Sequence, residues 1–208
     1  VEIGNENWGE EYHKNYKVFF DAIKAKYPDV ITIADSQNMG EAPIEIADDH
    51  YYNNPDFFFD NVGLYDKTDR NGPRIYVGEY AVNQGVGRGY LLGALAEAAF
   101  LMGLEKNADL VRICSYAPLF VNVNDRSWPV NLIEFDSSRV VGRSSYHVQA
   151  MFSANRPDES LKTVVTSPGE PNRPDVFAIA GFDRRKGEIV LKAVNRSLNS
   201  QTEIGRAH

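Results

Sequence analysis

The stretch Val1-Glu2-Ile3-Gly4-Asn5-Glu6-Asn7-Trp8-Gly9 decides how the rest of the chain can fold. Val1 and Ile3 alternate with polar neighbours, which predicts a short strand, and the chain then turns at Gly4 into a run of helical periodicity at 10–26. A strand that ends in a carboxylate and is followed at once by a helix is typical of a βα unit of a barrel, where strand ends gather at the catalytic face. Glu6 is therefore the first candidate for chemistry.

The same alternation of strand and helix recurs along the chain. We expect strands at 30–35, 44–52, 74–80 and 110–116, helices at 10–26, 55–66, 90–107 and 144–155, and a loop from 117 to about 138. This rhythm predicts an α/β fold, either a barrel or a doubly wound sheet, and the periodicity alone does not choose between them.

The pattern changes after Arg156-Pro157-Asp158. Three β-rich runs at 161–166, 176–182 and 188–195 are separated by Pro and Gly turns, with no helical run between them. Such runs predict antiparallel strands. We therefore expect an α/β domain at 1–158 and the start of a second, antiparallel β domain at 159–208.

Composition excludes several classes of partner. The chain has 208 residues, 29 acidic against 22 basic, and a formal net charge of −7, which argues against nucleic acid or an anionic membrane surface as partner. No apolar run approaches the roughly 20 residues needed to span a bilayer. The single cysteine, Cys114, excludes an intramolecular disulfide, and we expect it in the core. Because the chain begins inside a strand, we also expect it to be part of a longer protein.

A second carboxylate matches the setting of Glu6. Glu79 follows the β-rich run Arg74-Ile75-Tyr76-Val77-Gly78, so both glutamates lie just past a strand and a glycine. In a closed barrel two such carboxylates can face each other across a bound sugar. Glycoside hydrolysis needs such a pair, one to protonate the departing oxygen and one to attack the anomeric carbon or to activate water. Either glutamate alone would more often be an ordinary surface residue.

The neighbouring residues fit a sugar. Asn5 can hydrogen-bond a ring hydroxyl next to the reacting carbon. Aromatic side chains can stack on sugar rings, and the candidates are Trp8, Tyr51, Tyr52, Tyr80, Tyr116 and Trp128. About half of these six are expected in the core instead. His50 can orient a carboxylate or bind a hydroxyl. We expect no metal site, because the contiguous Asp48, Asp49 and His50 point in alternating directions.

Four motifs in combination resemble one family of glycosidases. They are Val1 to Gly9, His50-Tyr51-Tyr52, Tyr76-Val-Gly-Glu-Tyr-Ala-Val-Asn83 and Ser115-Tyr-Ala-Pro-Leu-Phe-Val-Asn-Val123. Together they resemble the α-L-arabinofuranosidases of glycoside hydrolase family 51, which belong to the clan A barrel glycosidases. The resemblance covers essentially the whole chain. At 128–131 the chain reads Trp-Pro-Val-Asn where relatives often read Trp-Asn-Pro-Asp.

The resemblance implies a fold and a mechanism. The chain would run from about strand four to strand eight of a (β/α)8 TIM barrel and then enter a C-terminal β-sandwich. The reaction would be a retaining double displacement without a cofactor, with Glu6 as general acid/base and Glu79 as nucleophile. Substrate contacts would come from Asn5, Trp8, His50, Tyr52, Trp128 and Asn131.

The resemblance also implies a substrate and a setting. The partner would be an arabinofuranosyl-bearing oligo- or polysaccharide such as arabinoxylan or arabinan, and the full-length enzyme would form a homo-oligomer as relatives do. A secreted or periplasmic location is favoured, with a cytoplasmic one left open. Two alternatives stay open for function: another clan A glycosidase, such as an endo-xylanase or β-glycosidase, and a non-catalytic carbohydrate-binding fragment that uses Trp8 and Trp128 as ring platforms.

Overall fold

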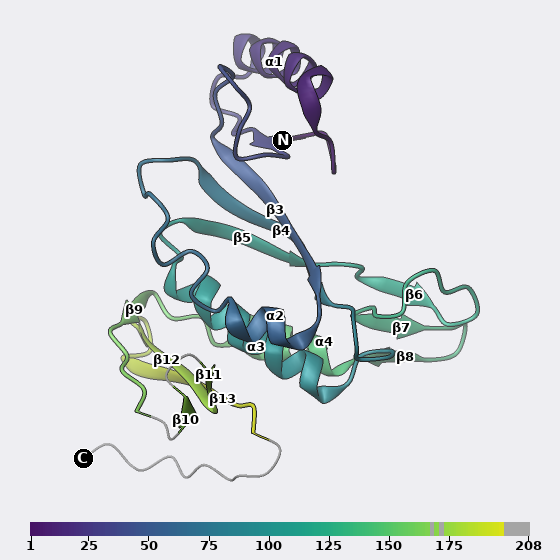
Figure 1. Cartoon of the computed structure of the whole chain (residues 1–208), viewed down its shortest axis with the longest axis vertical. Helices are drawn as coiled ribbons and strands as arrows, with labels where there is room; N and C mark the ends of the chain where they lie inside the picture. Colours follow the sequence, from purple (N-terminus) through teal and green to yellow (C-terminus); the bar gives the residue numbers. More distant parts are fainter. Residues whose placement is uncertain (167–168, 171–172, 198–208) are drawn as a thin grey trace. The chain divides into compact units, whose positions relative to one another are not determined.

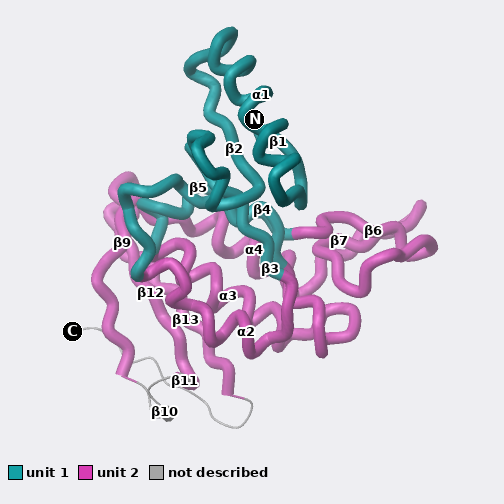
Figure 2. The backbone as a smooth tube through the Cα atoms, turned by 45° about the horizontal axis from the view of Figure 1, so that its top comes forward, with its two compact units in different colours: residues 1–51, 67–80, 107–116 teal, residues 52–66, 81–106, 117–208 magenta. Residues whose placement is uncertain are grey.

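The computed structural model of the chain describes residues 1–166, 169–170 and 173–197, so the expected second domain at 159–208 reaches beyond the described residues. The chain forms two compact units (Figure 2). The first comprises residues 1–51, 67–80 and 107–116, and the second comprises 52–66, 81–106 and 117–208. Each unit is discontinuous in sequence.

A five-stranded sheet carries the β-rich runs of the α/β region (Figure 1). Its strands are β1 (Glu2–Ile3), β2 (Ile33–Ala34), β3 (Ile46–Asn53), β4 (Arg74–Val82) and β5 (Val111–Tyr116). They neighbour one another in the order of the sequence, and the pairs β1–β2, β2–β3 and β4–β5 are parallel. Sequential parallel order favours a segment of barrel, because a doubly wound sheet reverses its strand order at a switch point.

Helix α1 (Gly9–Lys26) builds the core of the first unit. Its Tyr12 and Tyr16 pack with Ile3, Ala34, Met39 and Ala42 in one buried cluster. The hydroxyl of Tyr12 donates to the carbonyl of Ile3 at 2.6 Å and accepts from the backbone N–H of Asp35 at 2.9 Å. One buried side chain therefore ties the ends of β1 and β2 together, directly beside the loop that carries Glu6.

Helices α2 (Pro55–Asp60), α3 (Leu91–Lys106) and α4 (Ser144–Ala154) belong to the second unit. Helix α3 is buried along most of its length, as its Ala- and Leu-rich sequence predicts. It packs against both α2 and α4, and the rings of Phe58 and Phe100 meet edge to face at 5.2 Å. Asn54 caps α2 through its side chain, which accepts from the N–H of Phe57, and Pro55 follows at the first helical position.

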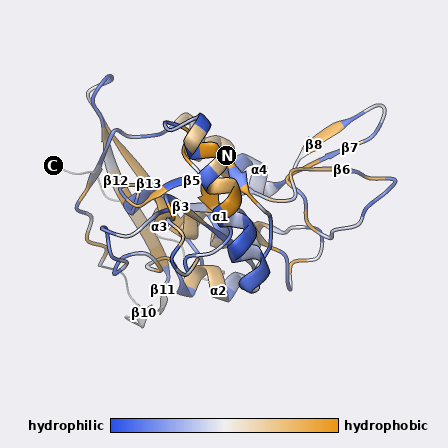
Figure 3. Ribbon diagram, turned by 90° about the horizontal axis from the view of Figure 1, so that it is seen from above, coloured by the Kyte–Doolittle hydropathy of each residue, from blue (hydrophilic) through white to orange (hydrophobic). Residues whose placement is uncertain are grey.

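The remaining strands of the second unit form small sheets. In the part that the structure describes, antiparallel strands β13 (Glu188–Asn195), β12 (Val176–Asp183) and β9 (Glu159–Leu161) form one sheet, and β10 (Gly169–Glu170) pairs with β11 (Arg173–Pro174). Strands β6 (Phe120–Asn122), β7 (Ile133–Phe135) and β8 (Val140–Gly142) form another. Strand β8 is coloured as hydrophobic in Figure 3, and its Val140 and Val141 are exposed. Within the described ranges, every helix is too short or too polar to cross a bilayer.

Several expectations about elements are confirmed and some are wrong. The helices expected at 10–26, 90–107 and 144–155 are present to within one residue at each end. The expected helix at 55–66 ends at Asp60, since residues 61–67 continue as turns. The expected loop at 117–138 contains β6 and β7, three residues each, which are too short to show a periodic pattern. Cys114 is exposed rather than buried, on a strand that is outermost in the described sheet.

Candidate active site

The first unit brings both sequence-predicted glutamates to one place. Glu6 follows β1, Glu79 lies in β4, and His50 of β3 lies beside both. The Nδ1 atom of His50 is 3.1 Å from Oε1 of Glu6 and 3.6 Å from Oε2 of Glu79. A carboxylate oxygen of Glu6 and one of Glu79 lie within 4.8 Å of each other. The two glutamates therefore lie close together, as expected, with His50 beside both, although Glu79 lies inside β4 rather than past the end of a strand.

The loop that presents Glu6 is held in an uncommon conformation. Glu6 has φ +51°, and the preceding Gly4 has φ +105°, where a side chain would collide with Asn7, Tyr12 and Asp35. The carboxylate of Asp35, at the end of β2, accepts the backbone N–H of Asn7 at 2.8 Å. A non-glycine residue at positive φ costs roughly 1–3 kcal/mol, and such residues cluster at functional sites.

Three further carboxyl groups lie next to the pair, and the sequence did not point to them as part of the site. Glu2, Asp35 and Asp48 each place an oxygen within 4.8 Å of the others. Desolvation of Glu2, together with its hydrogen bond to Asp48, raises the pKa of Glu2 to about 7. Burial and the charge of Asp48 raise the pKa of Asp35, although the N–H of Asn7 opposes this.

The protonation of His50 depends on these acids. Burial lowers the pKa of His50, but the hydrogen bond with Glu6 and the charges of Asp48 and Glu79 outweigh burial, so the net shift is upward. The side chain of His50 is 17% exposed, that of Glu6 is 53% exposed and that of Glu79 is 29% exposed. A substrate can therefore reach both glutamates, while the imidazole is largely shielded.

The other predicted substrate contacts are distributed between the units. In the first unit, Asn5 and Trp8 are exposed beside the Glu6 loop, with Trp8 79% exposed. In the second unit, the rings of Tyr52 and Trp128 lie 5.1 Å apart, so these two aromatics do meet. Asn131 is buried and donates its side-chain N–H to the carbonyl of Trp128 at 2.9 Å. Asn131 thus holds the Trp128 loop in this structure.

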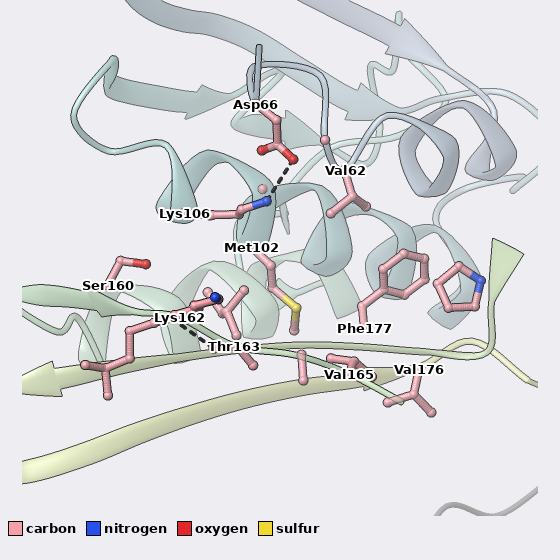
Figure 4. Close-up of a pocket in the computed structure, with 16 residues that line it drawn as sticks. Val62, Asp66, Met102, Lys106, Ser160, Lys162, Thr163, Val165, Val176 and Phe177 are labelled. Carbon is pink, nitrogen blue, oxygen red and sulfur yellow. Dashed lines mark hydrogen bonds and ion pairs between the residues drawn. The ribbon is translucent and has the colours of Figure 1, made fainter. Parts of the chain in front are cut away.

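Some aromatic candidates belong to the core. Tyr80 is fully buried and meets Tyr116 edge to face at 5.8 Å, so Tyr80 cannot offer its face to a ligand. A separate cavity of about 700 Å³ lies in the second unit between α3 and the strands β9 and β12 (Figure 4). Lys106 and Asp66 form an ion pair at its lining, and Met102 and Phe177 supply apolar surface. None of the predicted site residues lines this cavity.

Two acidic groupings could in principle hold a cation. One is Glu6, His50 and Glu79, and the other is Glu2, Asp35 and Asp48. The expectation from the sequence concerned only the contiguous Asp48, Asp49 and His50 as ligands. Alternation along β3 does separate Asp49, which accepts from Gln37, from Asp48 and His50, whose side chains lie on one face. No local sequence pattern reveals these groupings, because their members come from different strands and meet only through the register of the sheet.

Family models and relatives match this chain along most of its length. Residues 78–203 match the α-L-arabinofuranosidase C-terminal domain, and residues 1–70 match the α-L-arabinofuranosidase 1 domain. The chain is 43% identical over 208 residues to α-L-arabinofuranosidase 1 of Arabidopsis thaliana, covering 97% of this chain and 30% of the relative. It is 36% identical to the extracellular exo-α-L-arabinofuranosidase of Streptomyces chartreusis, covering 86% of this chain and 23% of the relative. The chain therefore spans less than a third of the length of these relatives.

Solved structures give the same result. An arabinose-bound GH51 α-L-arabinofuranosidase matches with a TM-score of 0.86 and 28% identity, covering 97% of this chain and 34% of that one. The arabinose complex of the Thermotoga maritima α-L-arabinofuranosidase has a TM-score of 0.74 at 19% identity, covering 93% and 51%, and this likeness concerns the fold. These likenesses are consistent with part of a barrel followed by part of a sandwich domain. One family model alone matches more than half of this chain, so the chain belongs to the α-L-arabinofuranosidases of glycoside hydrolase family 51.

Proposed function

We propose that the protein containing this chain removes terminal α-L-arabinofuranosyl residues from plant polysaccharides such as arabinoxylan and arabinan, with retention of configuration. The observation that carries this proposal is the approach of Glu6 and Glu79, whose nearest oxygens lie within 4.8 Å of each other. Retaining glycosidases hold their two carboxyl groups about 5–5.5 Å apart, whereas inverting ones need about 6.5–9.5 Å to admit a water. The close pair favours retention.

The two glutamates take different roles in this reaction. Glu79 attacks the anomeric carbon and forms the arabinosyl–enzyme ester, while Glu6 protonates the departing oxygen and then takes a proton from the incoming water. The greater exposure of Glu6 fits contact with both a leaving group and water, and the more buried Glu79 fits a nucleophile. Asn5, Trp8, His50, Tyr52, Trp128 and Asn131 are proposed to contact or position the sugar.

The finer architecture belongs to the same proposal. Strands β1 to β5 correspond to strands four to eight of the (β/α)8 barrel, and the antiparallel strands from β9 onward begin the sandwich. Sequential parallel order supports the first assignment. The boundary between 158 and 159 stays a prediction, as do the homo-oligomer and the secreted or periplasmic location.

Hydrolysis of p-nitrophenyl α-L-arabinofuranoside tests the function, in a form of the protein extended to the length of its relatives. Glu79→Ala should abolish turnover, because no ester can form. Glu6→Ala should keep the first step for this substrate, because nitrophenolate leaves without protonation, and added azide should then intercept the intermediate as an arabinosyl azide of retained configuration. Glu41→Ala, at an exposed turn, is the matched control. Full activity in Glu79→Ala would contradict the assignment.

Two other readings give different results in the same assay. Another clan A glycosidase would hydrolyse an aryl β-xyloside or β-glucoside and leave the arabinofuranoside intact. A carbohydrate-binding fragment would turn over neither substrate and would keep its affinity for arabinan when Glu6 and Glu79 are both changed to Gln.

A further inference from the structure

Asp48 is a buried residue next to the candidate catalytic pair, and it contacts both His50 and the backbone just before Glu79. Its side chain is 2% exposed. Oδ1 accepts the backbone N–H of Gly78 at 2.8 Å, and Oδ2 lies 2.7 Å from Nε2 of His50. One buried carboxylate therefore holds the backbone immediately before Glu79 and the imidazole that lies beside Glu6 and Glu79.

The contact with Gly78 leaves no room for a side chain. A Cβ atom at position 78 would come within 2.2 Å of Oδ1 of Asp48. Because the side chain of Asp48, in β3, meets the backbone of β4 at Gly78, its carboxylate cannot turn away from His50 without losing the bond to Gly78. The geometry therefore fixes the carboxylate relative to both partners.

This arrangement determines which ring nitrogen of His50 carries the proton. An ionised carboxylate can only accept hydrogen bonds, so Nε2 must donate to Asp48. A neutral imidazole has a single N–H, which leaves Nδ1 as an acceptor, and Nδ1 is the atom that faces Glu6 and Glu79. When the Glu6 carboxyl group carries its proton, Nδ1 can accept a hydrogen bond from it, and the proton stays on Glu6 for general-acid catalysis.

We propose that Asp48 is a positioning residue for hydrolysis: it fixes His50 in the Nε2–H tautomer, so that Nδ1 is presented to both catalytic carboxyl groups. This inference rests on the proposed function. Asp48 touches neither the substrate nor the reacting atoms and acts through His50 and Gly78. The buried aspartate of the serine-protease triad orients its histidine and selects the tautomer in the same way.

The charged groups around this pair come from four elements. Glu2 of β1 and Asp35 at the end of β2 face Asp48, Glu79 of β4 faces His50, and Glu6 faces His50 from the loop after β1. Burial lowers the pKa of His50, but hydrogen bonding between His50 and an ionised Glu6, together with the charge of Asp48, raises it, so the net shift is upward. Removing the charge of Asp48 alone should therefore lower the pKa of His50.

Asp48→Asn tests the proposal, because it keeps the size of the side chain and an oxygen for the N–H of Gly78. With that oxygen held by Gly78, the amide group faces Nε2 of His50 as a donor, which forces the proton onto Nδ1. Nitrogen chemical shifts of the His50 ring, assigned with His50→Gln and read above the pKa of His50, where the ring is neutral, should show Nε2–H in the parent and Nδ1–H in the variant. kcat should fall about 10- to 1,000-fold with a shifted pH profile, while KM changes little.

Asp49→Asn is the matched control, since it makes the same change one residue along β3, where the side chain bonds Gln37 and Tyr51. It should leave the His50 tautomer and its pKa unchanged. An Nδ1–H tautomer in the parent would overturn the proposal whether or not Asp48→Asn folds, and so would an unchanged tautomer and pH profile in a folded Asp48→Asn. A parent with Nε2–H that fails to hydrolyse any arabinofuranoside would instead overturn the proposed function.

Discussion

At the scale of single residues, the backbone of Glu6 shows a conflict between function and stability. Its φ of +51° is unfavourable for a residue with a Cβ atom. Glu6→Gly should therefore relieve folded-state strain and raise the free energy of unfolding, by about 1 kcal/mol after the added entropy of the unfolded chain is deducted. The same variant should lose hydrolysis.

Urea denaturation of Glu6→Gly and Glu6→Ala measures this strain. Glu6→Ala keeps the Cβ atom and should be no more stable than the parent, although it also removes the carboxylate. Equal stability of the two variants would show that Glu6 is not strained in solution.

The acids around His50 have the geometry of metal ligands as well as of proton-transfer groups, and treatment with a chelator distinguishes a metal site from a proton-transfer site. The Glu6, His50 and Glu79 grouping offers one nitrogen and two carboxylate oxygens within 4.8 Å of one another. If these groups act as a proton-transfer and nucleophilic set, treatment with EDTA followed by dialysis should leave hydrolysis of the arabinofuranoside unchanged. Loss of activity that added Zn²⁺ or Mn²⁺ restores would assign the grouping to a metal.

At the scale of elements, α3 carries a buried acid that should make stability depend on pH. Glu97 is 1% exposed and accepts the N–H of Val82 at 2.8 Å, three residues after Glu79 in sequence. Burial raises the pKa of Glu97 from 4.5 to about 7, although hydrogen bonds from Ser145 and Val82 oppose the shift. The folded state therefore binds more protons than the unfolded state between pH 4.5 and 7.

The stability that Glu97 contributes therefore decreases as the pH rises. The contribution of Glu97 to stability is greatest below about pH 4.5, where both states are protonated, and falls as the pH rises towards 7, by on the order of 3 kcal/mol. Glu97→Gln keeps the acceptor for Val82 without a charge, so it should be more stable than the parent at pH 8 and similar at pH 4.5. Urea denaturation at both pH values checks this, with Glu41→Gln as control. Parallel stability profiles for parent and Glu97→Gln would contradict it.

The elements also show what sequence patterns can and cannot predict. Helix α1 was predictable because apolar residues recur at helical spacing and Pro28 limits its end. The pairing of Glu6 with Glu79 was predictable because parallel strands end at one edge. Asp48 was not assigned a role, because its contact with Gly78 depends on the register of β3 against β4, which no local pattern carries. Strands β6 and β7 were missed because three residues define no period.

At the scale of the whole molecule, the sheet limits what this chain can do alone. In the part that the structure describes, β1 and β5 are the outermost strands, and an eight-stranded barrel has no outermost strand. β1 is only two residues long, yet it leads directly into the Glu6 loop. The position of Glu6 therefore depends on a strand that is paired on one side, with β2.

We expect a form extended upstream to the length of the relatives to hydrolyse p-nitrophenyl α-L-arabinofuranoside at least about 100-fold faster than the 208-residue chain, because a closed barrel would hold the Glu6 loop in place. Hydrogen exchange gives the structural counterpart: amides of β1 and of Asn7 should exchange more slowly in the extended form, while those of α3 should change little. Equal exchange at β1 combined with equal activity would mean that the Tyr12 and Asp35 bonds suffice to hold the loop. Slower exchange at β1 without a gain in activity would mean that ordering the Glu6 loop does not restore catalysis, and it would favour the carbohydrate-binding alternative.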